Sequence, residues 1–199
     1  MDMQLDFFKE PKDGRKPPSK LPDGLRYQPA LISRTDETRL VERVSALPFR
    51  EFEFHGYTGK RRVVSFGWKY DFSSQRLQKA AAIPDYLLPL RDLAALFANL
   101  DPESLQQVLV TEYAEGAGIG WHRDKAVFGE VVGVSLLAAC TLRFRRKAGD
   151  AWERANLHAE PRSAYHLRGP ARSEWQHSIA SVDTLRYSIT FRSMAGLSE

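Results

Sequence analysis

The sequence predicts an α+β fold that is mainly β, a double-stranded β-helix (jelly roll) with helices packed outside it. Six short segments are rich in β-branched and aromatic residues, as strands are. Turns containing Gly, Pro or Asp separate these segments, and two other segments show helical periodicity. Many short strands with few helices favour a double-sheet jelly roll. The length of 199 residues suits one domain with a sizeable core.

The composition indicates a soluble globular protein, with 43% hydrophobic and 27% charged residues. The longest apolar run, residues 131–140, is too short to cross a bilayer and fits a buried strand. The N-terminus has no basic segment leading into an apolar stretch, so we expect no secretory signal. Cys140 is the single cysteine, which excludes an internal disulfide, and we expect it to be a small buried hydrophobe. These features favour a reducing, cytoplasmic location.

Two parts are expected along the chain, a flexible N-terminal arm at 1–24 and a single domain at 25–199. Residues 9–24 are rich in Pro, Gly and charge and lack apolar periodicity. The first helix is expected at 33–47, where Ser33 and Asp36 have the capping-box spacing and Pro48 follows the end. A second helix is expected at about 89–99.

Strands are expected at 63–70, 107–113, 131–137, 141–147, 163–167 and 186–192. The last one alternates strictly, with Arg186, Ser188, Thr190 and Arg192 on one face and Tyr187, Ile189 and Phe191 on the other. Two guanidinium groups that face a jelly-roll interior would be costly unless an anion pairs with them. Planar bidentate donors suit carboxylates, and 2-oxoglutarate has two. The alternative is that this face meets water.

A candidate metal site begins at His122 and Asp124, which are separated by one residue and therefore project from the same face of an extended strand. A third ligand from His177 would complete a two-His, one-carboxylate triad of the kind that binds non-haem Fe(II). His158 and His166 compete with His177 for that place, although His166 also fits a structural imidazole within a strand. The tripeptide alone is weakly specific, and its alternative interpretation is a polar strand end. His55 is interpreted as a solvated residue beside a turn.

These motifs together resemble the AlkB family of Fe(II)/2-oxoglutarate-dependent dioxygenases, which are oxidative nucleic-acid demethylases. The resemblance spans about residues 25–193 and rests on H-x-D, a downstream His and a closing R-x-S-x-T-x-R. It extends to VLVTEYAEGAGIGWHRD, where Tyr113 holds the place of a tyrosine that reaches the co-substrate. It also extends to LRGPARSEWQHSI, which favours His177 over His166 as the third ligand. The resemblance implies a nucleotide-recognition lid at about 51–71.

Carried over to this chain, the resemblance implies that His122, Asp124 and His177 hold iron. Arg186, with Tyr113, would pair with the distal carboxylate of 2-oxoglutarate, and Arg192 would lie near Asp124 and the proximal carboxylate. The implied reaction uses O2 to demethylate N-alkylated bases in DNA or RNA, releases succinate, CO2 and formaldehyde, and serves alkylation repair. The alternatives are the same chemistry on a protein or small molecule, or a non-catalytic nucleic-acid-binding module.

Two positions depart from the family pattern. Ser188 replaces the usual asparagine of the C-terminal motif and remains a hydrogen-bonding group. Ala126 stands where several nucleobase-repair members carry an acid that touches the base, two residues after the iron-binding Asp. The second departure weakens the expectation that the usual methylated bases are the substrates.

Aromatic and basic residues lie together in the segment that the resemblance assigns to the lid. Phe66, Trp68 and Tyr70 alternate on one expected strand face, where they could stack on an extruded base or simply cover the core. Lys60, Arg61 and Arg62 are expected to meet backbone phosphates. The net charge of +4 is compatible with a polyanionic partner without requiring one. We expect a monomer that acts on single-stranded nucleic acid and not at a membrane.

A second basic cluster follows the expected strand at 141–147. Arg143 and Arg145 share one face, Leu142 and Phe144 share the other, and Arg146 and Lys147 extend the charge. Two interpretations stay open for this cluster, a solvated rim and a groove that contacts phosphates.

Overall fold

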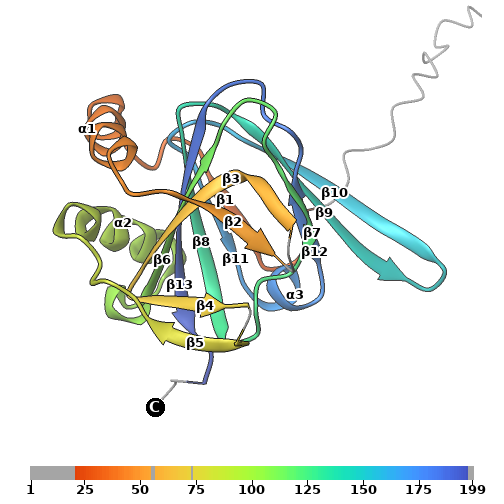
Figure 1. The fold of residues 1–199 in the computed structure, drawn as a ribbon. Helices are drawn as coiled ribbons and strands as arrows, with labels where there is room; N and C mark the ends of the chain where they lie inside the picture. The colour runs from red at the N-terminus through yellow and green to blue at the C-terminus, as the bar shows by residue number, and fades with distance from the viewer. Residues whose placement is uncertain (1–20, 55–56, 73, 197–199) are drawn as a thin grey trace, which may run out of the picture.

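The computed structural model describes residues 21–54, 57–72 and 74–196 and contains two facing antiparallel sheets (Figure 1). The larger sheet has the order β1 (Leu25–Gln28), β11 (Ala164–Leu167), β8 (Phe128–Leu136), β13 (Arg186–Met194), β6 (Gln107–Tyr113), β3 (Tyr57–Phe66) and β2 (Arg50–Phe54). The smaller sheet has the order β10 (Ala151–Ala159), β9 (Cys140–Ala148), β12 (Gln176–Ile179) and β7 (Ile119–His122). The jelly roll predicted from the sequence is confirmed.

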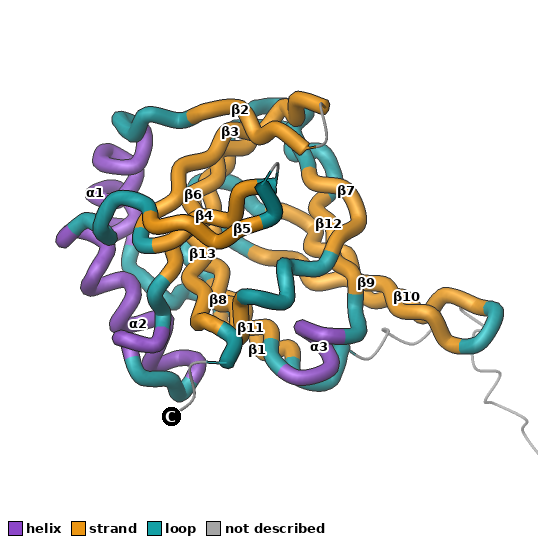
Figure 2. Tube along the Cα trace, turned by 60° about the horizontal axis from the view of Figure 1, so that its bottom comes forward, coloured by secondary structure: helices purple, strands orange, loops and turns teal. Residues whose placement is uncertain are grey.

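The helices cover the outer side of the larger sheet, as Figure 2 shows, while β9 and β10 project on the opposite side of the molecule. They are α1 (Arg34–Ser45) and α2 (Leu88–Ala98); a short α3 (Gly169–Ser173) precedes β12. Single 3-10 turns at Asp85–Leu87 and Pro102–Ser104 flank α2. The predicted helix start is confirmed, since the Ser33 side chain accepts a hydrogen bond from the Asp36 amide as an N-cap.

Two apolar clusters divide the core, and side chains on both faces of β13 are buried, although only one face joins an apolar cluster. Tyr187, Ile189 and Phe191 pack with α1 and α2 in the cluster outside the larger sheet. The second cluster lies between the sheets and includes Leu142 and Phe144 of β9. The alternate β13 residues, Arg186 to Arg192, therefore face the space between the sheets, where they are buried. The alternative in which this face meets water is wrong.

Two predicted elements need correction. The strand expected at 63–70 is broken at Gly67, whose φ is +71° and where a Cβ would overlap the Gln106 carbonyl oxygen. Beyond this break, Trp68 and Tyr70 belong to a separate hairpin of β4 (Trp68–Asp71) and β5 (Arg76–Lys79), while Phe66 stays in the core. The three aromatics therefore do not share one strand face.

The apolar run at 131–140 is also broken, because β8 ends at Leu136 and Leu137 has a φ of +69°. Cys140 is buried as expected, but it begins β9. Strand β10 was not predicted, since its buried residues are the small or medium-sized Ala155, Leu157 and Ala159 between exposed polar ones.

No helix in the described residues is long and apolar enough to cross a membrane. Residues 1–20 of the predicted arm and His55 lie outside the described residues. The side chains at 52–59, within the segment expected to form a lid, lie outside them as well.

Candidate active site

Strands β7 and β12 bring His122 and His177 together. The two residues are direct cross-strand partners, and their ring centroids lie 4.2 Å apart. His177 also lies beside Phe144 of β9, at 6.3 Å between ring centroids, so both imidazoles are on the inner face of the smaller sheet. The structure thus selects His177, among the candidates for a third ligand, as the neighbour of His122.

Asp124 lies two residues beyond His122, just past the end of β7, and turns inward. Its Oδ2 is 3.6 Å from Nε2 of His177. Its Oδ1 accepts hydrogen bonds from Arg192, at 2.9 Å from Nε and 2.7 Å from Nη2. Oδ2 is buried without a hydrogen-bond donor in the described residues. Arg192 therefore fixes one oxygen of the carboxylate and leaves the other facing the imidazoles.

The protonation states of these groups suit a cation. Burial lowers the pKa of His177 to about 3, helped by the neighbouring His122, and burial also lowers the pKa of His122. Burial alone would raise the pKa of Asp124, but Arg192 and His177 outweigh it and hold that pKa below its usual range. At neutral pH the site therefore offers two neutral imidazoles and a carboxylate, the protonation states that metal ligands need.

The candidate ligands fit Fe(II), although no group of three or more His, Cys, Asp or Glu side chains in the described residues is already arranged as a metal cage. Asp124 is drawn toward Arg192, while Oδ2 remains orphaned. The Nδ1 of His122 is 2.8 Å from the Gly120 carbonyl oxygen, so Nε2 is left for a metal. Two imidazoles and one carboxylate are the donors of non-haem iron centres that keep positions open for other ligands.

Arg186 forms a candidate anion site on β13, between the sheets. Its side chain is fully buried, its Nε donates to Ser135 Oγ at 3.0 Å, and Nη1 and Nη2 have no partner in the described residues. Its Cζ lies 5.0 Å from the ring centroid of Tyr113, the cross-strand partner on β6. A buried charge with two unused donors is unfavourable alone, and a carboxylate would satisfy both.

Sequence reasoning missed two residues around these candidates, Tyr165 and Arg172. Tyr165, on β11, is buried, and a Cβ at Gly133 would overlap its phenol ring, so the glycine makes room for it. Burial raises the pKa of Tyr165, and the charge of Arg186 lowers it to a lesser extent. Arg172 donates to the carbonyls of Lys125, Phe128 and Gly129 and so fixes the chain that follows Asp124. Arg61, which was expected to meet a phosphate, also lies near these candidates and belongs to the basic trio described below.

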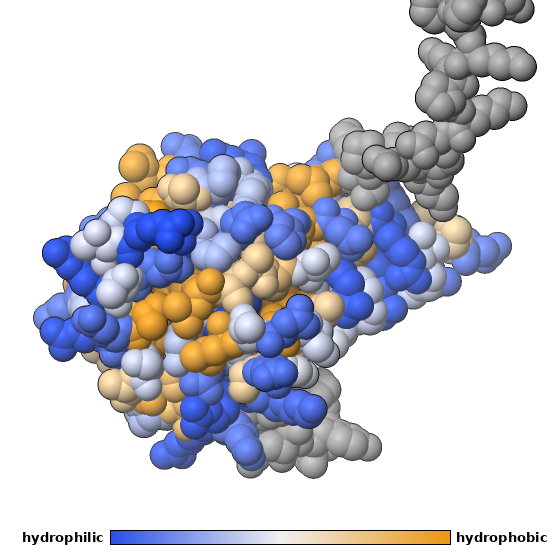
Figure 3. Space-filling view, turned by 90° about the horizontal axis from the view of Figure 1, so that it is seen from above, coloured by the Kyte–Doolittle hydropathy of each residue, from blue (hydrophilic) through white to orange (hydrophobic). Residues whose placement is uncertain are grey.

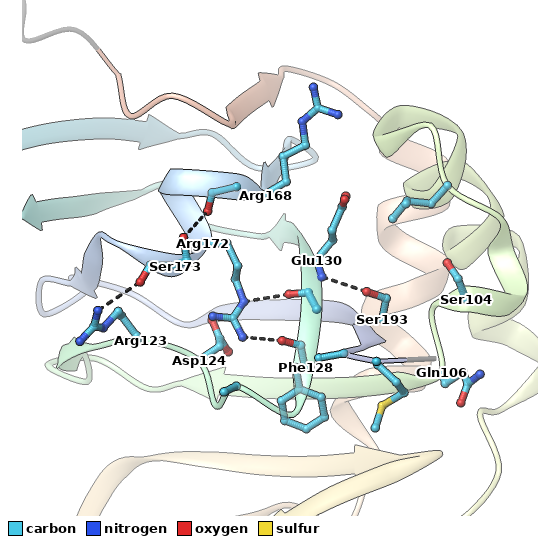
Figure 4. Close-up of a pocket in the computed structure, with 17 residues that line it drawn as sticks. Ser104, Gln106, Arg123, Asp124, Phe128, Glu130, Arg168, Arg172, Ser173 and Ser193 are labelled. Carbon is cyan, nitrogen blue, oxygen red and sulfur yellow. Dashed lines mark hydrogen bonds between the residues drawn. The ribbon is translucent and has the colours of Figure 1, made fainter. Parts of the chain in front are cut away.

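A cavity of about 770 Å³ reaches Asp124 from the side of α3 and the end of β13 (Figure 4). Asp124 and Ala126 line it, whereas His122, His177 and Arg186 do not. In Figure 4, Arg172 points toward the β8 backbone with Asp124 beside it. Ala126, which replaces the acid of the family pattern, is exposed at this cavity.

The hairpin of β4 and β5 lies close to the candidate metal site. Lys125, the residue after Asp124, places its Nζ 4.9 Å from the Tyr70 ring centroid and 5.2 Å from that of Phe72. Trp68 is half-buried, lies outside both apolar clusters and has the Lys79 Nζ 4.5 Å from its ring centroid. Both aromatics expected in a lid are thus on a small hairpin, and Tyr70 is next to the turn that carries Asp124.

The basic trio of β3 does not form one surface, because successive residues of a strand point to opposite faces. Lys60 is exposed. Arg62 donates to Glu112, with 2.7 Å between Nη2 and Oε1. Arg61 is 8% exposed and pairs across the strands with Tyr113, and burial lowers its pKa in the field of Tyr113, Arg192 and Asp124. The expectation that all three meet backbone phosphates is corrected for Arg61, which points into the site.

The competing histidines are elsewhere. His166 is fully buried on β11, and its Nε2 is 2.6 Å from Glu130 Oε2, as expected for a structural imidazole. His158, on β10, is exposed and lies 3.2 Å from Glu160. Neither residue is close to the pair of His122 and His177 within this fold.

Comparison with known proteins identifies the class. The family described as "2OG-Fe(II) oxygenase superfamily" matches residues 24–192, and the chain belongs to this superfamily. Residues 24–192 are therefore the domain of an oxygenase superfamily that uses Fe(II) and 2-oxoglutarate. The solved structure titled "The structure of OsALKBH1" shares the fold, with a TM-score of 0.63 at 18% identity over 89% of this chain and 100% of that chain.

Within the superfamily, the AlkB resemblance is confirmed. The "Alkylated DNA repair protein ALKBH8 homolog" of Arabidopsis thaliana is 26% identical over 196 residues, 85% of this chain and 55% of the relative. The "tRNA (carboxymethyluridine(34)-5-O)-methyltransferase ALKBH8" of Macaca fascicularis is 25% identical over 202 residues, 96% of this chain and 30% of the relative. The chain spans about half the length of the first relative and under a third of the second.

Proposed function

We propose that the chain oxidatively demethylates N-alkylated bases in single-stranded DNA or RNA, with His122, Asp124 and His177 holding iron. Arg186, with Tyr113, binds the distal carboxylate of 2-oxoglutarate, and Arg192 lies near the proximal one. The observation that carries the proposal is a pair of buried, unsatisfied groups between the sheets, Oδ2 of Asp124 and the terminal nitrogens of Arg186. One group needs a cation and the other an anion, which is what iron and 2-oxoglutarate provide.

When bound, iron, 2-oxoglutarate and O2 would supply the oxidation of a substrate methyl group. A methyl group on nitrogen would then be released as formaldehyde, and 2-oxoglutarate would be converted to succinate and CO2. The residues of the chain bind and orient the reactants. Arg192 keeps Oδ1 of Asp124 engaged, so Oδ2 faces the imidazoles. Tyr113 and Tyr165 flank Arg186 and keep water from its guanidinium. Burial makes the contact between Arg186 and a carboxylate stronger than it would be in water.

Nucleic acid is the substrate class that the surroundings of the site favour. Trp68 and Tyr70 offer ring faces for an extruded base, on a hairpin beside the turn that carries Asp124. Lys60 is exposed on β3 (Tyr57–Phe66) and is the member of the basic trio that remains proposed for a phosphate. Two relatives are named for DNA repair and for a tRNA methyltransferase. A cytoplasmic monomer remains part of the proposal.

The test is mass spectrometry of methylated oligonucleotides and methylated peptides after incubation with the protein, iron, 2-oxoglutarate and ascorbate. We expect loss of the methyl group from oligonucleotides, with succinate and formaldehyde in equal amounts. Demethylation of peptides alone would place the same chemistry on protein. Iron and 2-oxoglutarate binding without any turnover would indicate a non-catalytic nucleic-acid-binding module instead.

A further inference from the structure

The outer face of the smaller sheet carries a row of cations and indoles that the proposed active site does not use. Its members are Trp121 on β7, Arg143, Arg145 and Lys147 on β9, and Trp152 and Arg154 on β10. We call these six residues the outer ladder. They face away from the core, because the alternate residues of the same strands, such as Leu142 and Phe144, are buried between the sheets.

The side chains of the outer ladder stack on one another. The Cζ of Arg145 lies 4.4 Å from the ring centroid of Trp121 and 4.4 Å from that of Trp152. Arg143 lies 5.3 Å from the Trp121 ring, and the Nζ of Lys147 lies 5.2 Å from the Trp152 ring. Two indoles thus hold these cations in fixed positions on an exposed sheet face. Side chains that were only solvated would not need to be held in this way.

The charge of the outer ladder is not neutralised. No described carboxylate forms an ion pair with Arg143, Arg145, Lys147 or Arg154. Arg145 and Arg154 are direct cross-strand partners, and like charges in that position destabilise a sheet. Arg146, on the other face of the same strand, is instead paired with Glu153 and Glu174. The sequence therefore places its acids against one face of this hairpin and leaves the outer face positive.

The stacking leaves hydrogen-bond donors free. A guanidinium stacks through its flat face, and its N–H groups lie in its plane. The Nε of Arg145 donates to Gln176 and that of Arg143 to Ser178, while their terminal nitrogens donate to no described residue. Trp152 is 38% exposed near the tip of the projecting hairpin. In Figure 3 this projecting end is covered mainly by hydrophilic residues.

We propose that the outer ladder is a docking surface for single-stranded nucleic acid, in which the cations bind backbone phosphates and the indoles stack on bases. Fixed cations beside partly exposed indoles are the combination that binds single strands without reading their sequence. From Arg143 to Lys147 the row extends about 13 Å along β9. An acidic protein would use the cations but would leave the indoles without a matching partner.

The outer ladder is connected to the proposed active site through β7. This strand is at the edge of the smaller sheet, Trp121 points outward, and the next residue, His122, points inward to the candidate iron site. A nucleic-acid strand bound to the outer ladder can pass around this edge of the sheet toward the candidate iron site. The inference rests on the proposed function for its substrate, and it adds a contact outside the active site that long strands reach and very short ones do not.

The experiment compares the unaltered protein with the triple variant Arg143→Gln/Arg145→Gln/Arg154→Gln, with Trp152→Ala, and with Arg39→Gln as a control on the distant, exposed α1. Binding of an unmethylated 12-nucleotide single strand is measured by fluorescence anisotropy over a salt series. We expect the triple variant to bind at least tenfold more weakly, with the slope of log affinity against log salt reduced by about 2. Trp152→Ala should weaken binding roughly fivefold or more, and Arg39→Gln should bind as the unaltered protein does.

Turnover of a methylated trinucleotide and a methylated 12-nucleotide strand separates this inference from the proposed function. The triple variant should keep trinucleotide turnover and lose the advantage of the longer strand. Unchanged 12-nucleotide binding in the triple variant would overturn the ladder even if both substrates are demethylated. Loss of binding in that variant, with no demethylation by any form of the protein, would support the ladder and refute the proposed reaction.

Binding to phosphatidylserine vesicles but not to the oligonucleotide would overturn the choice of partner. Normal oligonucleotide binding by Trp152→Ala would overturn base stacking.

Discussion

The two arginines of β13 share one face but have different surroundings. Arg192 is neutralised by Asp124 and also donates to Gln107 at 2.9 Å. Arg186 has a hydroxyl, Ser135 Oγ, as its one hydrogen-bond partner in the described residues. The difference assigns Arg192 to orienting the carboxylate of Asp124 and Arg186 to an anion from outside the chain. The spacing of the motif could not distinguish these roles, because both residues occupy the same face.

Arg186→Ala should weaken 2-oxoglutarate binding by about 2–5 kcal/mol, since it removes one partner of a buried charged contact. The apparent affinity for 2-oxoglutarate in the decarboxylation reaction measures this loss. Arg186→Lys should bind more weakly than the unaltered protein, because an ammonium cannot replace the two parallel donors. An unchanged affinity in Arg186→Ala would assign the co-substrate to other residues.

Asp124→Ala should abolish turnover and lower the affinity for Fe(II), because it removes the anionic ligand and leaves Arg192 unpaired. Metal content after dialysis against a limiting iron buffer, together with succinate production, measures both effects. The matched control is Asp85→Ala, an exposed carboxylate before α2, which should retain both properties. Full activity in Asp124→Ala would contradict the assignment of the triad.

Individual site residues could be predicted from the sequence where their partners are close along the chain or belong to the same motif. His122 and Asp124 are two residues apart on one strand end, and Arg186 and Arg192 follow strand alternation. Tyr165 was missed, and Arg61 was wrongly expected to meet a phosphate, because their partners are on strands distant in the sequence. Arg61 faces Tyr113 across β3 and β6, and Tyr165 fills the space above Gly133. No local pattern records such pairings.

Gly67, between β3 and β4, turns the chain out of β3 and so sets the direction of the β4–β5 hairpin. Gly67→Ala should destabilise the fold by more than about 1 kcal/mol, since its positive φ is combined with an overlap between the new Cβ and the Gln106 carbonyl. Gly149→Ala is the matched control, because its φ of +59° imposes similar backbone strain with nothing within 4 Å of the Cβ. The midpoint of urea unfolding compares the two variants, and equal losses would show that the overlap is relieved at little cost.

The same hairpin carries the proposed lid. Trp68→Ala should lower turnover of methylated oligonucleotide about tenfold or more, because stacking contributes about 1–3 kcal/mol per base. Decarboxylation of 2-oxoglutarate without substrate should remain nearly unchanged, as Trp68 is not part of either apolar cluster. A variant that loses both activities together would mark Trp68 as structural.

Elements were predicted well where side chains alternate and poorly where a short turn lacks the usual residues. Strand β6 was predicted with its observed bounds, from the β-branched and aromatic residues of Gln107–Tyr113. The turn after β8 contains Leu137, Ala138 and Ala139, without Gly or Pro, so the apolar run concealed it. Gly67 interrupts an otherwise regular strand pattern, and the backbone contact that requires it comes from Gln106.

Across the whole molecule, the smaller sheet separates two surfaces with different uses. Its inner face carries His122 and His177, next to the space that contains Arg186. Its outer face carries the outer ladder, whose charge is free of carboxylate partners in the described part of the chain. Both surfaces depend on the same strands, so the register between β7 and β12 positions the chemistry and the proposed docking surface together.

The unsatisfied groups between the sheets also predict how the whole fold responds to its ligands. Asp124 Oδ2 and the Arg186 guanidinium are desolvated without partners, so Fe(II) and 2-oxoglutarate should bind the folded chain and not the unfolded one. With both ligands at about 100 times their dissociation constants and without O2, each should stabilise the fold by about 2.7 kcal/mol. The melting temperature should then rise by roughly 2–4 °C per kcal/mol.

Differential scanning fluorimetry of three proteins would separate the two contributions to this rise in melting temperature. The unaltered protein should respond to metal and, further, to 2-oxoglutarate, and a chelator should reverse both shifts. Arg186→Ala should keep the shift with metal and lose the added shift with 2-oxoglutarate. Asp124→Ala should lose both, because in the proposed site 2-oxoglutarate would be held by the metal as well as by Arg186. A full 2-oxoglutarate shift in Arg186→Ala would mean that the orphaned guanidinium is not the anion site.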